Sequence, residues 1–101
     1  MSMEKYAPIS GSTVTMSATA TAAQATLPNN GYANHIVVNN LGPNYAYFAY
    51  GIGSITAQCS DAVIQPYREF FLDYNNTQTT ISAVCDSGMS AIFKITEFYG
   101  A

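Results

Sequence analysis

His35 is the one histidine of the chain, so any mechanism that needs an imidazole would depend on it. Imidazole groups act as acids, bases or metal ligands near neutral pH. The sequence has no second histidine to complete a zinc site, and it contains neither a G-x-S-x-G nor an H-E-x-x-H motif. A lone histidine at the start of a predicted strand is typically a surface or hydrogen-bonded side chain. We therefore expect no catalytic role for His35.

Glu69 and Asp73 are the best candidates for a glycosidase-like pair of carboxylates. In an extended strand both would point to the same face, about 13 Å apart at roughly 3.3 Å per residue. Glycosidases hold their two carboxyl groups about 5 to 10 Å apart. The pair is too widely spaced for that chemistry, and we predict a protein that is not an enzyme.

Asp61 and Asp86, together with several Asn pairs, have the composition of a calcium-binding loop. However, no D-x-[DN]-x-[DN]-G run is present, and Asn pairs are also common in tight turns. We therefore predict no bound metal and no cofactor.

Cys59 and Cys85 are too few to define a disulfide framework. The first residues lack the basic and apolar regions of a signal peptide, and disulfides are rare in a reducing cytosol. We expect both cysteines to be free, with Cys85 packed as a small hydrophobic side chain in an alternating strand.

Tyrosines are concentrated between residues 45 and 50 and recur elsewhere in the chain. Strand propensity and filling of a sandwich core explain such a cluster in the simplest way. Tyrosine also gives a large contact area with a polar tip, so the same residues suit a protein interface, and stacking of sugars is a third possibility. The predicted interface residues are Tyr6, Tyr45, Tyr47, Tyr50 and Tyr67.

The chain of 101 residues is long enough for one domain only. Only 9% of its residues are charged, against about 25% in an average domain. Three basic residues and a net charge of −3 argue against nucleic-acid binding, and no run of about 20 apolar residues is present to span a membrane. A polar but uncharged surface suits permanent contact with other proteins.

Alternation with a period of two, interrupted by turn residues, predicts an all-β protein of about eight short antiparallel strands. We expect a single-domain β-sandwich of the jelly-roll type, with an immunoglobulin-like sandwich as the alternative. Residues 1–10 should form an extended N-terminal arm and residues 11–101 the sandwich domain. The predicted strands lie within residues 11–20, 23–27, 35–40, 45–50, 62–65, 69–74, 79–85 and 90–98.

Two local features refine this prediction. The apolar alternation shifts by one residue near Ala22, which indicates a β-bulge or a corner between two strands. Turns are expected at Pro28-Asn-Asn-Gly, Leu41-Gly-Pro-Asn, Asn75-Asn76 and Asp86-Ser-Gly.

Several segments resemble those of small structural proteins of tailed phages in their order along the chain and in the kinds of residues that they contain. These segments are GSTVTMSATATAAQATLP, HIVVNNLGPNYAYFAYG, AVIQPYREFFLDY, ISAVC and GMSAIFKITEFYG. The resemblance covers roughly residues 11–100. It implies a jelly-roll capsid decoration, or cement, protein, and it transfers no residue-level site.

The resemblance also implies where the protein acts and what it binds. The protein would be made in the host cytoplasm and would bind the major capsid protein on the capsid exterior of the virion. It would associate with itself, as a trimer in many such proteins. A head–tail, fibre or receptor-binding component of the virion is the alternative, followed by a carbohydrate-binding module.

Overall fold

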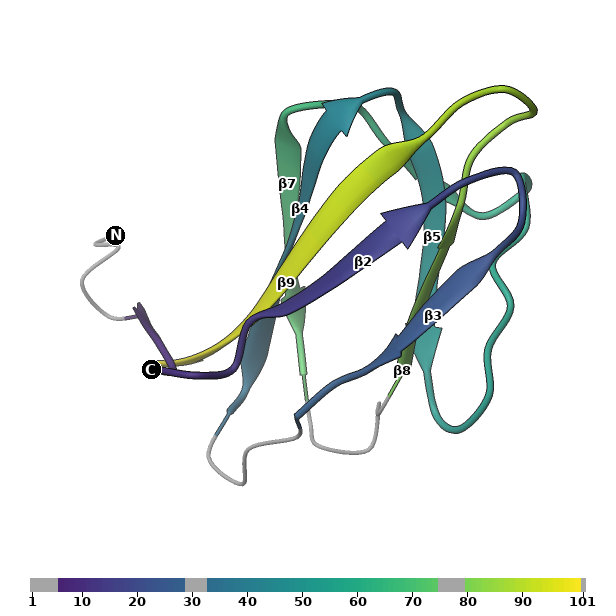
Figure 1. The fold of residues 1–101 in the computed structure, drawn as a ribbon. Helices are drawn as coiled ribbons and strands as arrows, with labels where there is room; N and C mark the ends of the chain where they lie inside the picture. Colours follow the sequence, from purple (N-terminus) through teal and green to yellow (C-terminus); the bar gives the residue numbers. More distant parts are fainter. Residues whose placement is uncertain (1–5, 29–32, 75–79, 101) are drawn as a thin grey trace.

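The computed structural model describes residues 6–28, 33–74 and 80–100, and every regular element in these ranges is a β-strand. Two sheets pack face to face as a sandwich (Figure 1). This confirms the predicted all-β sandwich, with nine strands in the described residues where about eight were expected. The strands are β1 (Tyr6–Pro8), β2 (Val14–Ala18), β3 (Ala23–Thr26), β4 (His35–Pro43), β5 (Ala46–Gly51), β6 (Ala62–Ile64), β7 (Arg68–Asp73), β8 (Thr80–Val84) and β9 (Ala91–Gly100).

The two sheets have the strand order of a jelly roll. The five-stranded sheet runs β1-β9-β4-β7, with β2 also paired to β9, and the four-stranded sheet runs β3-β8-β5-β6. Every paired strand is antiparallel to its neighbour. Because the chain crosses repeatedly between the sheets, all neighbouring strands except β5 and β6 are non-consecutive in sequence, and the predicted jelly-roll arrangement is confirmed.

The shift in alternation near Ala22 marks a corner where the chain passes from one sheet to the other. Met16 and Ala18 in β2 are buried and pack in the core from the five-stranded sheet. Ala23 and Ala25 in β3 pack against the same core from the four-stranded sheet. Changing sheets reverses the side of the chain that faces inward, so the apolar positions move by one residue.

The turn predicted at residues 41–44 is wrong, because β4 continues to Pro43. Its pairing with β9 shifts in register between Asn40 and Pro43. The buried Asn40 amide supports this irregular segment: its Oδ1 accepts the Gly42 N–H at 2.7 Å. Its Nδ2 donates to the carbonyls of Asn44 and Ile64 at 2.9 and 3.1 Å. One side chain therefore satisfies backbone groups that a regular ladder would have paired.

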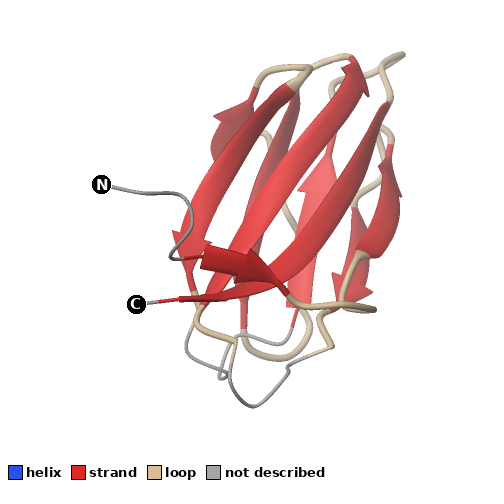
Figure 2. Cartoon of the chain, turned by 90° about the vertical axis from the view of Figure 1, so that its left-hand side faces the viewer, coloured by secondary structure: helices blue, strands red, loops and turns tan. Residues whose placement is uncertain are grey.

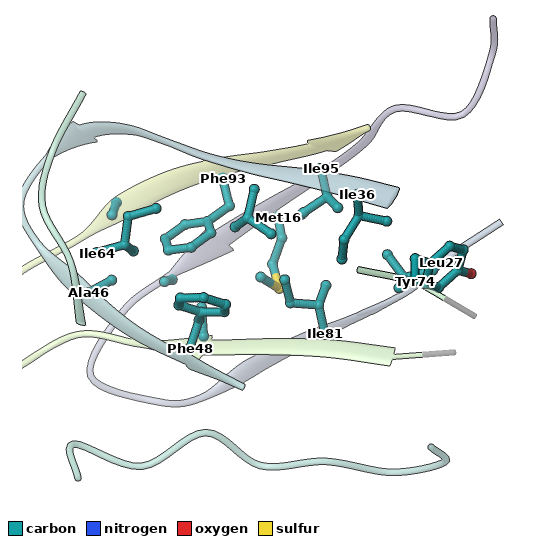
Figure 3. Close-up of a cluster of buried hydrophobic side chains, with 14 of the residues drawn as sticks. Met16, Leu27, Ile36, Ala46, Phe48, Ile64, Tyr74, Ile81, Phe93 and Ile95 are labelled. Atoms are coloured by element: carbon teal, nitrogen blue, oxygen red, sulfur yellow. The ribbon is translucent and has the colours of Figure 1, made fainter. Parts of the chain in front are cut away.

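The core lies between the two sheets and contains large apolar side chains from both. Figure 3 shows Phe48 and Phe93 facing each other between the layers, with Met16 beside them. Among the largest fully buried apolar side chains are Phe93, Ile36, Ile64, Ile81 and Ile95.

A carboxyl group is also buried at one end of the core. Glu97 has no exposed surface, and the Tyr74 hydroxyl donates a hydrogen bond to its side chain. Burial, followed by this hydrogen bond, raises the pKa of Tyr74, so the phenol stays neutral in the folded protein.

Part of the predicted N-terminal arm pairs with the sandwich. Residues 6–8 form β1 against the end of β9, with Pro8 opposite Phe98. Ile9 is buried, and its N–H donates to the Glu97 carbonyl at 2.8 Å. The buried Ser12 hydroxyl donates to the Ile9 carbonyl at 2.7 Å, which fixes the chain as it enters β2. Residues 1–5 of the arm, and the turns predicted at Pro28-Asn-Asn-Gly and Asn75-Asn76, lie wholly or partly outside the described residues.

Candidate interaction surface

The outer faces of the two sheets differ in how much of them the chain itself covers. All five residues of β8, in the middle of the four-stranded sheet, are buried. The segment between β5 and β6 packs over this sheet: the Ala57 N–H donates to Ser82 Oγ at 2.9 Å, and the Ile55 N–H donates to Gln24 Oε1 at 3.1 Å. In contrast, β9 alternates between buried and accessible residues along most of its length. The five-stranded sheet therefore presents the more open face (Figure 2).

A hollow of about 600 Å³ lies on this open face, and we call it the outer-face hollow. Its walls come from four strands of the five-stranded sheet and from the residue that precedes β2. The lining residues are Pro8, Thr13, Val37, Asn39, Glu69, Phe71, Thr96 and Phe98.

Strand register explains how distant residues meet in the hollow. Val37 in β4 lies opposite both Thr96 in β9 and Phe71 in β7, which makes one row across three strands. Thr13 extends this row, because its hydroxyl lies 2.8 Å from that of Thr96. Val37 is only 8% exposed although it lies outside the core cluster, which indicates how closely its neighbours enclose it.

An aromatic cluster forms one end of the hollow. The rings of His35 and Phe71 are stacked, with centroids 4.9 Å apart and an interplanar angle of 3°. The Tyr6 ring meets both edge-on, at 4.9 and 5.0 Å, and Phe98 meets Phe71 edge-on at 5.9 Å. Phe71 is nevertheless 42% exposed, so the cluster offers apolar surface to a partner.

His35 is oriented by a polar neighbour on each side. Its Nδ1 lies 2.9 Å from Oδ1 of Asn34, and its Nε2 lies 3.4 Å from Oδ1 of Asp73. Glu69 projects from the same face of β7 but two residues beyond Phe71, whose ring packs against the imidazole. The structure thus places His35 beside one acid, with Glu69 in the hollow on the other side of an aromatic ring.

The five tyrosines of the predicted interface occupy separate parts of the molecule. Tyr6 belongs to the aromatic cluster, whereas the Tyr50 ring packs against the core and its hydroxyl donates to the Asp73 carbonyl at 3.0 Å. Tyr45 and Tyr47 interact at the four-stranded sheet, and Tyr67 is exposed in the turn before β7. Sequence reasoning did not single out Phe71 and Phe98 together, because only the pairing of β7, β4 and β9 brings them close.

Tyr45 and Tyr47 both donate hydrogen bonds to one carboxylate oxygen. Their hydroxyls lie 2.5 and 3.3 Å from Oδ2 of Asp86, and the Cys59 thiol donates to Oδ1 of the same residue at 3.5 Å. The hydrogen bond and charge of Asp86 raise the pKa of Tyr45 to about 12. The hydrogen bond from Tyr45 in turn is the main cause that lowers the pKa of Asp86.

The pKa of Tyr45 should return toward its ordinary value of 10.0 when Asp86 is replaced by asparagine, which carries no charge. The absorbance of ionised tyrosine, measured as the difference between each protein and its Tyr45→Phe counterpart, should have a midpoint near pH 12 in the native protein and a lower midpoint in Asp86→Asn. Circular dichroism over the same range monitors folding. An unchanged midpoint would contradict the assigned hydrogen bond.

The same contacts fix the sign of the pH dependence of stability. A raised pKa of Tyr45 favours the protonated phenol in the folded state, so this stabilisation is complete below pH 10 and is lost as the pH rises toward 12. A lowered pKa of Asp86 favours its carboxylate, so that contribution is present above pH 3.8 and is lost as the pH falls below it.

Both cysteines are free, Cys59 exposed and Cys85 buried, and burial is the main cause that raises the pKa of the Cys85 thiol. Within residues 6–28, 33–74 and 80–100, no group of three His, Cys, Asp or Glu side chains is placed to hold a metal ion. The described ranges also contain no helix with the length and apolar character needed to cross a membrane.

No protein-family model matches the sequence, and no curated protein is significantly similar to it. Among solved structures, a crystal structure of PirA superimposes with a TM-score of 0.57 and 10% identity, over 88% of this chain and 95% of that one. A de novo designed double-stranded β-helix superimposes with a TM-score of 0.52 and 14% identity, over 84% of this chain and 96% of that one. A chain from Bacillus endospore appendages, which form disulfide-linked pili, superimposes with a TM-score of 0.50 and 15% identity, over 94% of this chain and 86% of that one. At these identities the likenesses concern the fold alone, and they place the chain among compact β-sandwich proteins of the jelly-roll, or double-stranded β-helix, type.

Proposed function

We propose that this protein is a non-enzymatic structural subunit that works by binding other protein subunits in a large assembly. The observation that carries the proposal is the outer-face hollow, an aromatic depression on the open face of the five-stranded sheet in which Glu69 is the one charged lining residue. Protein interfaces concentrate aromatic side chains at their centre and keep charged ones away from it. Phe71 and Phe98 in the hollow, with Tyr6 beside them, meet that description.

The assembly that we propose is the capsid of a tailed phage, with the protein as a decoration subunit on its exterior. The resemblance of residues 11–100 to small phage structural proteins supports this setting, and the jelly-roll architecture is compatible with it. Assembly as such is also a property of the Bacillus endospore appendages that this fold resembles. The low content of charged residues, 9%, lowers the cost of desolvating large contact surfaces.

The mechanism of stabilisation would be mass action. A subunit that binds the assembled shell, and not its separated or unfolded parts, stabilises the shell by linkage. Many copies bound at once make individually weak contacts durable through avidity. This mechanism needs neither a reactive group nor a cofactor, and its partners are the major capsid protein and other copies of the same chain.

Shells prepared with and without the protein test this proposal. The native protein should raise the temperature at which shells disassemble, and Phe71→Ser should lose most of that effect because it removes an aromatic contact from the hollow. Ile92→Ser is the matched control, since Ile92 is similarly exposed on β9 (45% against 42%) but does not line the hollow. Equal disassembly temperatures with and without the native protein would rule out a cement role.

The alternative location within a virion makes a different prediction. A head–tail, fibre or receptor-binding component would occupy one vertex or the tail, whereas a decoration protein covers the shell. Electron microscopy of virions that carry a labelled copy of this chain would distinguish the two.

A carbohydrate-binding role is the second candidate, and the composition of the hollow favours it. Phe71 and Phe98 could stack on a sugar ring, while Asn39, Glu69 and Thr96 could bond its hydroxyls. The tyrosines first considered for this role, Tyr45 and Tyr47, instead direct their hydroxyls to Asp86. Binding on a glycan array that Phe71→Ser abolishes would favour this candidate, and an array without hits would remove it.

A further inference from the structure

Tyr67 is the most exposed large hydrophobic residue that the structure describes, with 75% of its surface accessible. It has a φ of 64°, in the left-handed region that residues other than glycine seldom adopt. Two contacts hold it there: its N–H donates to the Asn40 carbonyl at 2.7 Å, and its ring lies directly over Gly42. A Cβ at position 42 would lie 2.8 Å from Cζ of the ring, so this close approach requires glycine. The fold thus holds an aromatic ring at its surface in a strained conformation, which is a common property of binding sites.

Arg68 follows Tyr67 and is also exposed. The described residues contain one acid–base side-chain contact, between His35 and Asp73, so Arg68 has no carboxylate partner among them. Tyr67 and Arg68 together present an aromatic ring beside a positive charge, and we call this pair the knob.

The outer-face hollow has the complementary chemistry. Phe71 and Phe98 supply aromatic walls, and Glu69 supplies a negative charge with no ion-pair partner among the described residues. Asp73, whose side chain is 99% exposed, adds a second negative charge at the aromatic end. A hollow of about 600 Å³ is within the range that small organic groups occupy in proteins, so it has room for a tyrosine side chain.

We propose that the knob of one copy of this protein docks into the outer-face hollow of a second copy. The Tyr67 ring would contact Phe71 and Phe98, and the Arg68 guanidinium would pair with Glu69 or Asp73. The inference rests on the proposed function and names the subunit that occupies the hollow. The complementarity of charge and of aromatic surface favours a second copy over an unrelated partner, since one chain supplies both halves.

The contact is heterologous, because the knob and the hollow are different surfaces. Tyr67 lies over Gly42, beyond the paired residues Asn40 and Arg68 at the end of the sheet, whereas the hollow lies on the sheet face. A pair of copies therefore keeps one free knob on one copy and one free hollow on the other. Head-to-tail contacts of this kind close into rings or continue as filaments. A closed ring of three copies would agree with the trimer that the resemblance to phage structural proteins implies.

Sedimentation velocity of the full-length chain over a range of concentrations tests the proposal. The native protein should self-associate, and Tyr67→Asn should weaken the association at least tenfold, as the loss of a central aromatic residue does. Asparagine tolerates positive φ, so this variant should fold. Phe71→Ser should weaken the association similarly, whereas Ile52→Asn, at a site that is 72% exposed and belongs neither to the knob nor to the lining of the hollow, should change it less than about twofold.

A mixture of the two defective variants provides the decisive measurement. Phe71→Ser keeps an intact knob and Tyr67→Asn keeps an intact hollow, so one productive contact should form between them. The mixture should give a 1:1 heterodimer that grows no further, although each variant alone is monomeric. A mixture that stays monomeric, or a native protein that is monomeric at all concentrations, would overturn the proposal.

Shell stabilisation, measured on the same samples, separates this inference from the proposed function. If the native protein stabilises shells without associating with itself, the inference is wrong and the hollow belongs to a shell protein or another ligand. If the native protein associates as described but leaves shells unaffected, the pairing is supported and the decoration role is wrong.

Discussion

Replacement of Phe93 by alanine should destabilise the fold by about 3–5 kcal/mol, the usual cost of removing a buried phenylalanine ring. Phe93 has no exposed surface and lies between the sheets, facing Phe48. Its strand, β9, pairs with three others, so a cavity at this position loosens both the core and the main ladder. Because domains of this size are stable by only about 5–15 kcal/mol, the variant should be largely unfolded under mild heating or low denaturant.

Urea unfolding followed by circular dichroism measures this effect. Phe71→Ala is the matched control: it removes the same ring from a site that is 42% exposed, so the free energy of unfolding should fall much less. Comparable losses for the two variants would mean that the sheets do not pack around Phe93 as described.

Replacement of Asn40 by leucine should lower the free energy of unfolding by about 3 kcal/mol or more. The Asn40 side chain makes hydrogen bonds of 2.7, 2.9 and 3.1 Å with three backbone groups of the β4–β5 region and of β6. Leucine has a similar size but cannot form hydrogen bonds with these three backbone groups. Each buried polar group left without a partner costs about 1–3 kcal/mol. The loss should also disturb Tyr67, whose N–H donates to the Asn40 carbonyl.

Asn39→Leu provides the control for Asn40→Leu, because the adjacent residue points into the outer-face hollow instead of the interior. The midpoint temperatures of thermal unfolding of the two variants should differ by several degrees, with Asn40→Leu the less stable. If Asn40→Leu melts at the native temperature, water or a rearranged turn must satisfy the three backbone groups.

Alternation along the chain was sufficient to predict the β-sandwich and the eight strands from β2 to β9. Met16 and Ala18, for example, alternate with polar residues in the sequence, and both are buried. The shift near Ala22 was expected to mark a bulge or a corner, and it is a corner between sheets. Strands and corners of this kind depend on residues that are close in the sequence, so the local alternation pattern is sufficient to predict them.

Features that depend on pairing between distant strands could not be predicted in the same way. Tyr6–Pro8 has too few residues to show any periodicity, and it is a strand only because β9 pairs with it. The extension of β4 to Pro43 depends on the hydrogen bonds of one buried asparagine side chain. The residues next to these positions show no pattern that would predict either the strand pairing or the asparagine hydrogen bonds.

The candidate site shows the same limit. The sequence indicated that aromatic side chains would form an interface, and it singled out tyrosines for this role. The outer-face hollow instead has Phe71 and Phe98 as its aromatic walls, which are 27 positions apart in the chain but meet edge-on across the sheet. The predicted interface residues Tyr6, Tyr45, Tyr47, Tyr50 and Tyr67 stay a prediction. Of these, Tyr6 lies beside the hollow and Tyr67 forms the knob.

The position of β9 in the five-stranded sheet has a consequence for biosynthesis. The ribosome makes β9 after β1, β2 and β4, yet β1 and β2 pair with no other strand of the described residues, and β4 has one further partner, β7. Until β9 leaves the exit tunnel, the nascent chain exposes apolar edges that can pair with other polypeptides. A translation arrest before residue 91 should therefore yield a protease-sensitive species that recruits chaperones, and release past residue 100 should abolish both properties.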